Sequence, residues 1–137
     1  MLGIAKVADI EGVPVYETPH LGCGYGSAGL CLPGIGIFVG QGTYEADVDV
    51  VRHEFGHIIQ ARTIGFLSFY LIVGLMSLMS AWTNGFGKGH QLYWTELWCN
   101  YVAKNYFEYS CQEKWNTNRF PVQNISDQTL RWIRWRL

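Results

Sequence analysis

Nineteen consecutive residues without a charge, Ile64 to Trp82, constrain the fold of this chain more than any other feature. A stretch of this length could cross a bilayer as a helix. Its two glycines and three serines, and the lack of a basic residue close to Trp82, instead favour a core helix or a pair of turns broken at glycine. We therefore expect the segment to pack inside the protein, and we keep membrane contact as the alternative that is not favoured.

The composition is that of one globular domain. With 137 residues, 49% of them hydrophobic, the chain has room for a single core, and residues 1–137 are expected to form one domain. Charged residues make up only 15%, so part of the surface is expected to be covered by a partner, a membrane or another segment. With a net charge of −1, the protein has no excess of positive charge to bind a phosphate backbone, which excludes nucleic acid as a partner. Composition leaves the oligomeric state open.

Neither the N-terminus nor the cysteines fix where the protein resides. The first seventeen residues contain no apolar run of the kind found in a secretion signal, so the localisation stays open between the cytoplasm and delivery by a secreted system. No cysteine belongs to a CxxC pair, and the four are Cys23, Cys31, Cys99 and Cys111. Free thiols are expected in the cytosol, and a Cys23–Cys31 disulfide bond is the favoured pairing outside it.

Short strands are expected in the first forty residues. The stretches GVPVYE, at 12–17, and GIGIFVG, at 34–40, are apolar or alternating runs bounded by glycine and proline. Between them, residues 19–34 read as a glycine-rich loop. The sequence therefore predicts a small N-terminal β-hairpin or sheet.

Two helices are expected after the strands. Acidic residues in a first turn and helical spacing of the apolar residues predict a helix from about Ala46 to Ile64, and a second from about Leu92 to Tyr109. The tail is expected to be extended from Pro121 and to end in a short helix capped by Ser126 or Asp127. These elements together predict an α+β fold.

The first of these helices carries the stretch HEFGH. Residues i and i+4 share a helical face, so His53 and His57 can both present a ring nitrogen to one zinc ion at about 2.0 Å. Glu54 points slightly around the helix, where it can act as general base on a water activated by the metal. A catalytic zinc needs three protein ligands and one open position, so a further ligand must come from elsewhere.

Glu96 is the favoured third ligand. It lies in the aromatic stretch YWTELWCNY, where a carboxylate without a partner would be costly. Asn100, four residues later on the same face, could accept a hydrogen bond from a liganding histidine. A surface glutamate and a buried amide with backbone partners are the structural alternatives for these two residues. The other candidate ligands downstream are His90, Glu108 and Glu113.

His90 is a candidate catalytic residue on an expected glycine-flanked loop. It could donate a hydrogen bond to an oxyanion, as donors in hydrolytic sites do. Tyr93 and Tyr101 are rival donors, and a solvated loop histidine is the structural alternative.

The motif HEFGH, followed after 38 residues by Glu96 within WTELWCN, resembles the zincin metallopeptidases of the gluzincin type. The longer pattern, from about Gly34 to Phe107, is similar to small bacterial metallopeptidase domains, some at the C-termini of Rhs-type toxins. The resemblance implies a zincin-like fold, in which a small sheet precedes the HExxH helix and a second helix carries the third ligand. It implies one Zn²⁺ ion, a peptide or protein substrate, ligands His53, His57 and Glu96, and Glu54 as base. Asn100 stands where thermolysin-like enzymes have an aspartate.

Two other interpretations remain open. HEFGH followed by an apolar segment also resembles the membrane-embedded site-2 proteases, although the Asp-Gly motif of those enzymes is missing from this sequence. The second is a non-catalytic binding module whose HExxH helix is structural. Metal content would separate a zinc enzyme from such a module.

Overall fold

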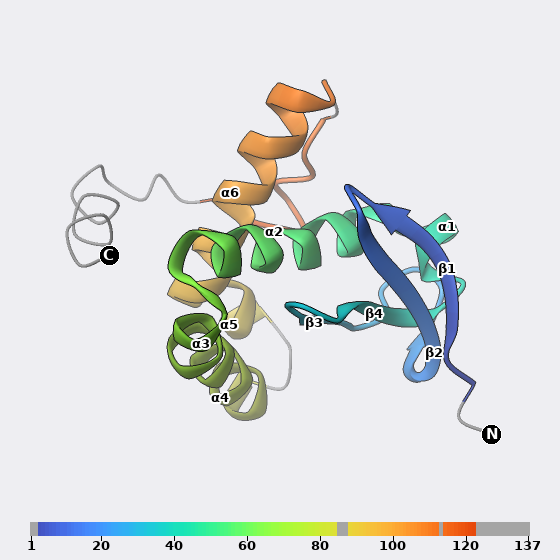
Figure 1. Ribbon diagram of the computed structural model, residues 1–137, viewed down its shortest axis with the longest axis horizontal. Helices are drawn as coiled ribbons and strands as arrows, with labels where there is room; N and C mark the ends of the chain where they lie inside the picture. Colours follow the sequence, from blue (N-terminus) through green and yellow to red (C-terminus); the bar gives the residue numbers. More distant parts are fainter. Residues whose placement is uncertain (1–2, 85–87, 113, 123–137) are drawn as a thin grey trace. The chain divides into compact units, whose positions relative to one another are not determined.

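The structure is a computed structural model that describes residues 3–84, 88–112 and 114–122. The chain divides into two compact units, Met1–Ile59 and Gln60–Leu137. The first contains a sheet and the second is helical, which confirms the predicted α+β class (Figure 1). The expectation of one domain over residues 1–137 stays a prediction.

The first unit is built on a four-stranded mixed sheet with the strand order β1-β2-β4-β3. β2 and β4 are parallel, whereas β1 pairs with β2 and β3 with β4 in antiparallel fashion. Val15, Ile37 and Val39 are fully buried, so the two central strands supply much of the core of this unit. The strands are β1 (Ala5–Ile10), β2 (Val13–Cys23), β3 (Gly29–Leu32) and β4 (Gly36–Gln41).

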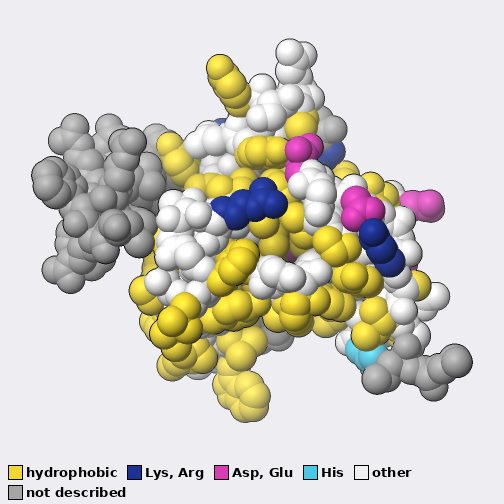
Figure 2. Space-filling model, in the orientation of Figure 1, with side chains coloured by type: hydrophobic (Ala, Val, Ile, Leu, Met, Phe, Trp, Pro, Cys, Tyr) yellow, Lys and Arg dark blue, Asp and Glu magenta, His cyan; other side chains and the backbone are white. Residues whose placement is uncertain are grey.

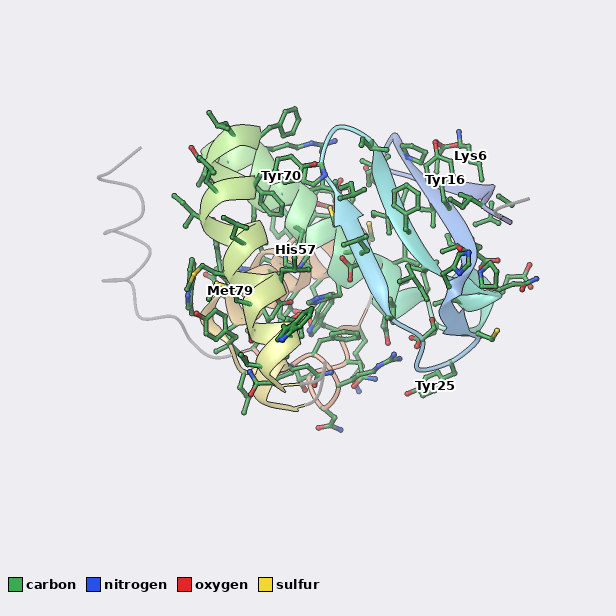
Figure 3. The ribbon with its side chains drawn as sticks, turned by 90° about the horizontal axis from the view of Figure 1, so that it is seen from below. Lys6, Tyr16, Tyr25, His57, Tyr70 and Met79 are labelled. Atoms are coloured by element: carbon green, nitrogen blue, oxygen red, sulfur yellow. The ribbon has the colours of Figure 1, made fainter. Side chains whose placement is uncertain are left out.

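The two predicted strands correspond to β2 and β4, but the predicted loop over residues 19–34 is wrong in part. β2 continues to Cys23, and β3 lies within the expected loop because its backbone pairs with β4, with Gly29 opposite Val39. β1 was not predicted, since most of its side chains are exposed and it lacks an apolar alternation. Tyr16 of β2 stacks on Phe38 of β4, with ring centroids 5.0 Å apart (Figure 3).

Two helices follow the sheet. α1 (Thr43–Ala46) begins where both carboxylate oxygens of Glu17 accept backbone N–H groups, from Gly42 at 2.8 Å and Tyr44 at 2.9 Å. α2 (Val48–Ile64) contains the HExxH motif and begins two residues later than predicted. Asp47, with φ −155°, interrupts the helical path between α1 and α2.

Gly65 separates α2 from the helices of the second unit. Its φ of 86° and ψ of 150° lie in a region that only glycine adopts readily, so the chain can change direction there. The elements that follow are α3 (Phe66–Ser68), the π-helical turn η1 (Phe69–Gly74), α4 (Leu75–Asn84), α5 (Lys88–Gln91) and α6 (Trp94–Ser110). The helix predicted over 92–109 is therefore present as α6.

The core of the second unit lies where the end of α2 packs on η1 and α6. It consists of Ala61, Phe69, Val73 and Trp98, flanked by Ile64 and Val102. The uncharged segment contributes only one side to this core, because only 22% of an 18-residue apolar stretch in the helix Phe66–Asn84 is buried. The expectation that Ile64–Trp82 is packed inside the protein is thus wrong for most of its side chains. In length and composition, Phe66–Asn84 is one helix of the described chain that could cross a membrane.

Beyond α6 the described chain returns along the helix. Trp115 donates its indole N–H to the carbonyl of Phe120 at 3.0 Å, and both side chains are buried. The short helix expected after Pro121, with its cap at Ser126 or Asp127, lies outside the described residues. No disulfide bond joins any of the four cysteines, all of which are described.

Candidate metal centre

Two histidines lie side by side on α2 in the first unit. The rings of His53 and His57 have centroids 5.2 Å apart and planes at 82°, as expected for residues one helical turn apart. His57, labelled in Figure 3, is only 6% exposed. One helical face therefore offers two imidazoles with little access to bulk water at His57.

Glu54 is buried against the backbone of the edge strand β3. Its side chain is 6% exposed, although a carboxylate normally seeks water. A Cβ atom built on Gly29 would lie 2.7 Å from Cγ of Glu54 and 2.8 Å from Cδ, closer than real Cβ contacts. Glycine at position 29 therefore makes room for the predicted catalytic carboxylate. Sequence reasoning missed this residue, because nothing in the glycine-rich stretch distinguishes Gly29 from its neighbours.

The turn that leads into β3 is held by the residues that begin α1 and α2. The Asp47 carboxylate accepts the N–H of Gly26 at 3.1 Å, and the Thr43 hydroxyl donates to the carbonyl of Gly24 at 3.1 Å. The hydroxyls of Ser27 and Thr43 are also hydrogen-bonded to each other. These contacts hold the turn before Gly29 in place. They thereby help to position the strand backbone against which the Glu54 side chain packs.

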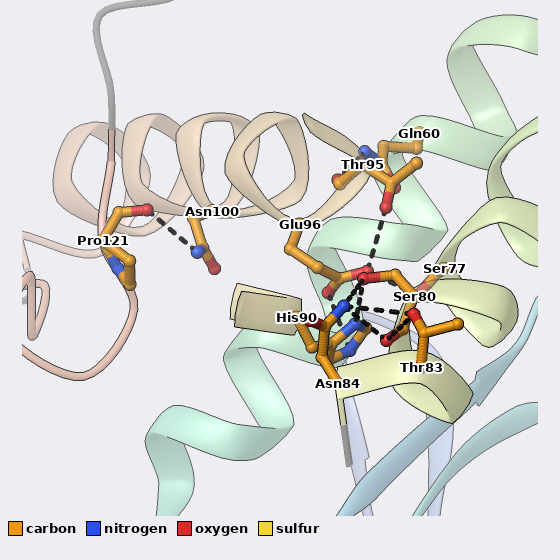
Figure 4. Close-up of polar contacts among 10 residues, drawn as sticks. All are labelled: Gln60, Ser77, Ser80, Thr83, Asn84, His90, Thr95, Glu96, Asn100 and Pro121. Carbon is orange, nitrogen blue, oxygen red and sulfur yellow. Dashed lines mark hydrogen bonds and ion pairs between the residues drawn. The ribbon is translucent and has the colours of Figure 1, made fainter. Parts of the chain in front are cut away.

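In the second unit, Glu96 lies at the centre of a polar cluster (Figure 4). It is 2% exposed, and its Oε1 accepts hydrogen bonds from the hydroxyls of Ser77 and of Thr95, the latter at 3.2 Å. Its Oε2 lies 3.9 Å from Nε2 of His90. The carboxylate is therefore buried and oriented. Glu96 is not the surface glutamate that was considered as the alternative to a metal ligand.

His90 lies on the short helix α5, and the expectation of a loop at this position is wrong. Its Nδ1 is 3.2 Å from the hydroxyl of Ser80 on α4, which holds the ring with Nε2 toward Glu96 (Figure 4). His90 is thus a half-buried, anchored histidine beside a predicted ligand.

Asn100 is 1% exposed and donates its side-chain N–H to the carbonyl of Pro121 at 3.0 Å. The amide therefore has a backbone partner. This is the arrangement expected of a buried structural amide, the alternative considered for Asn100. Of the remaining candidate ligands, Glu108 pairs with Lys104 at 3.9 Å, and Glu113 lies outside the described residues.

A His/His/Cys group formed by His53, His57 and Cys99 could hold a metal ion. Imidazole nitrogen and thiolate sulfur suit several transition metals, so the donors alone do not identify the ion. Sequence reasoning missed Cys99, because the cysteines were considered only for disulfide bonds. Its position three residues after Glu96, on one face of a helix, is the signal that could have identified it.

Comparison with family models, with curated proteins and with solved structures found no match for this chain.

Proposed function

We propose that this protein is a zinc-dependent peptidase that hydrolyses peptide bonds in a peptide or protein substrate. The observation that carries the proposal is the arrangement on α2, where His53 and His57 share a face and Glu54 is buried against Gly29. The proposal includes a zincin-like fold, which fits the order of sheet, HExxH helix and second helix.

Helix α6 is the proposed source of the third ligand. Gln60 and Ala61 follow His57 by three and four residues, so they continue its face of α2. Gln60 donates to the carbonyl of Thr95 at 2.9 Å, and Ala61 packs in the same cluster as Trp98. These contacts join the end of α2 to α6 within the second unit, and they support α6 as the source of the ligand.

Within α6 we propose Glu96 as the third ligand, as the resemblance to gluzincins implies. Nitrogen and carboxylate oxygen are ordinary zinc ligands, and the hydroxyls on Oε1 would orient the carboxylate as outer partners of metal ligands do. Cys99 is the rival ligand, favoured by its place in the His/His/Cys group.

A bound zinc ion would supply Lewis acidity that activates water and polarises the scissile carbonyl group. Glu54 then accepts a proton from the attacking water and returns it to the leaving amine. Its burial against Gly29 is consistent with this role, because a carboxylate held in one place can be oriented toward the attacking water. His90, held by Ser80, is proposed as a hydrogen-bond donor to the developing oxyanion.

The edge strand β3 supports a peptide as the substrate class. Among the strands of the described residues, β3 pairs only with β4 and lies at the edge of the sheet. An extended peptide can add to such an edge through backbone hydrogen bonds. Because Gly29 of β3 touches Glu54, a peptide bound there would pass close to the proposed base.

The base assignment is tested by comparing Glu54→Gln with His57→Ala. We expect Glu54→Gln to keep its zinc while hydrolysis of a peptide library falls by roughly 100-fold or more, the usual size of a general-base contribution. His57→Ala is expected to lose both. Zinc content is measured by elemental analysis and cleavage by mass spectrometry. Normal activity in Glu54→Gln, or loss of its metal, would contradict the assignment.

The third ligand is tested by comparing Glu96→Gln with Cys99→Ser in a zinc titration. We expect Glu96→Gln to weaken zinc binding by more than tenfold, because a charged ligand is lost, while Cys99→Ser binds zinc as the wild type does. The opposite result would assign the ligand to Cys99. A wild-type protein that holds no metal would favour the non-catalytic module.

A further inference from the structure

The helix Phe66–Asn84 has two faces of opposite character. One face, the inner stripe, consists of Phe69, Val73, Ser77 and Ser80, at spacings of four, four and three residues. Phe69 and Val73 pack in the core of the second unit. Ser77 donates to Glu96, and Ser80 contacts His90. The inner stripe therefore includes polar groups that are satisfied within the protein.

The opposite side, the outer face, is apolar and open. Each of its side chains is more than half exposed, and Trp82 is 89% exposed. No charged residue occurs from Thr63 to Gly87, and Figure 2 shows hydrophobic side chains over α3 and α4 without Lys, Arg, Asp or Glu among them. Tyr70 and Met79, labelled in Figure 3, lie along this helix. The outer face consists of Leu67, Leu71, Leu75, Leu78, Met79 and Trp82.

A water-facing helix exposes its polar residues, whereas the exposed face of this helix is apolar and two of its serines are turned toward the protein. A core helix of a soluble protein would be mostly buried, whereas only 22% of the 18-residue apolar stretch of this helix is buried. The segment also lies in the middle of the sequence, unlike a secretion signal. Serines turned inward and leucines turned outward are the pattern of a helix in contact with lipid.

We propose that the outer face docks on a phospholipid bilayer, with its leucines and Met79 among the acyl chains and Trp82 at the level of the headgroups. The exposed apolar side chains run along a helix of 19 residues, about 28 Å at about 1.5 Å per residue, so the helix can lie along the membrane surface with its outer face among the acyl chains. Trp82, close to the end of the helix, has the side chain that prefers the level of the lipid headgroups. The absence of charge indicates apolar attraction in place of attraction to anionic lipids, so binding to neutral lipid should withstand high salt.

Flotation with vesicles of phosphatidylcholine tests the proposal, and it requires neither metal nor peptide, so its failure would leave the proposed function intact. We expect the wild type to float with the vesicles at low and at high salt. The double variant Leu71→Lys, Leu78→Lys should lose about tenfold or more of its binding, because lysine is costly within the bilayer. A matched control, Tyr25→Lys with Ile35→Lys, changes exposed apolar residues of the first unit and should float as the wild type does.

A second measurement does not depend on whether the lysine double variant folds. Vesicles of brominated phosphatidylcholine should quench part of the tryptophan fluorescence of the wild type, and Trp82→Phe should remove that part. Two outcomes would overturn the proposal. In one, a soluble wild type stays with the vesicle-free fraction. In the other, the wild type forms a discrete dimer that the lysine variant dissociates, with no vesicle binding by either.

Discussion

At the residue scale, Gly29 is the least expected participant in the proposed site. The contact of its backbone with the Glu54 side chain leaves no space for a methyl group. Of the groups involved, the Glu54 side chain is the one that can move, since the backbone of β3 is tied to β4. The position therefore matters more for the placement of the carboxylate than for the stability of the sheet.

We expect Gly29→Ala to lower peptide hydrolysis by about tenfold or more, because a small misplacement of a catalytic group is costly. Zinc content should be unchanged, and the loss in free energy of unfolding should stay within about 1–3 kcal/mol, as for other overpacked sites. Kinetics, elemental analysis and urea denaturation provide the three readouts. Gly3→Ala is the control, because a Cβ there would meet only Pro19 at 3.8 Å. Full activity in Gly29→Ala would argue against Glu54 as the base.

Some residues of the candidate site could be predicted from the sequence, and others could not. His53, Glu54 and His57 are recognisable because their chemistry depends on spacing within one helix. Gly29 gains its significance from a residue far away in the sequence, so the sequence contains no local signal for it. Cys99 is indicated only by its place one helical turn after Glu96, and the group that it forms with the two histidines depends on residues far away in the sequence.

At the element scale, two glycines around the uncharged segment should respond to alanine with opposite signs. Gly65, with φ 86° and ψ 150°, joins α2 to α3 in a conformation that alanine adopts at a cost of about 1–3 kcal/mol. Gly74 lies inside a helical run, where a Cβ would meet its nearest neighbours at 3.6 and 3.8 Å, and alanine there should stabilise by about 0.5–1 kcal/mol.

Thermal and urea unfolding of Gly65→Ala and Gly74→Ala would measure this difference, and each variant serves as the control for the other. Equal stability of the two would mean that the break at Gly65 is not a fixed feature of the chain.

Element prediction from the sequence succeeded for the two longest helices. α2 and α6 have helical spacing along their full length, and their bounds differ from the predicted ones by two residues or fewer. β3 was missed because GLCL is too short and too glycine-rich to show a period of two. The uncharged segment was predicted to be helical or turn-like, but hydropathy does not reveal which side of it the protein covers.

At the scale of the whole molecule, metal binding and folding should be linked. The proposed ligands come from α2 and α6, which belong to different parts of the sequence, and a site of this kind is absent from the unfolded chain. Zinc should therefore stabilise the folded protein by mass action, by about 2.7 kcal/mol when free zinc is about 100 times its Kd.

We accordingly expect a chelator to lower the Tm of the wild type and of Glu54→Gln by several degrees. His57→Ala should show a low Tm that the chelator does not change further. Differential scanning calorimetry with and without added zinc would measure these shifts. A wild-type Tm that is insensitive to both zinc and chelator would contradict a metal site built from the two helices.

The contact between Gly29 and Glu54 has a consequence for how the sequence can vary. Two positions 25 residues apart share one small volume, so the substitutions tolerated at one depend on the residue at the other. A side chain at position 29 is accommodated only when the Glu54 carboxylate shifts or the side chain at position 54 is shorter, and either change moves the carboxylate away from its present position. The two positions are therefore epistatic. The substitutions that evolution can accept at position 29 of β3 are limited by the proposed need for a carboxylate at position 54 of α2.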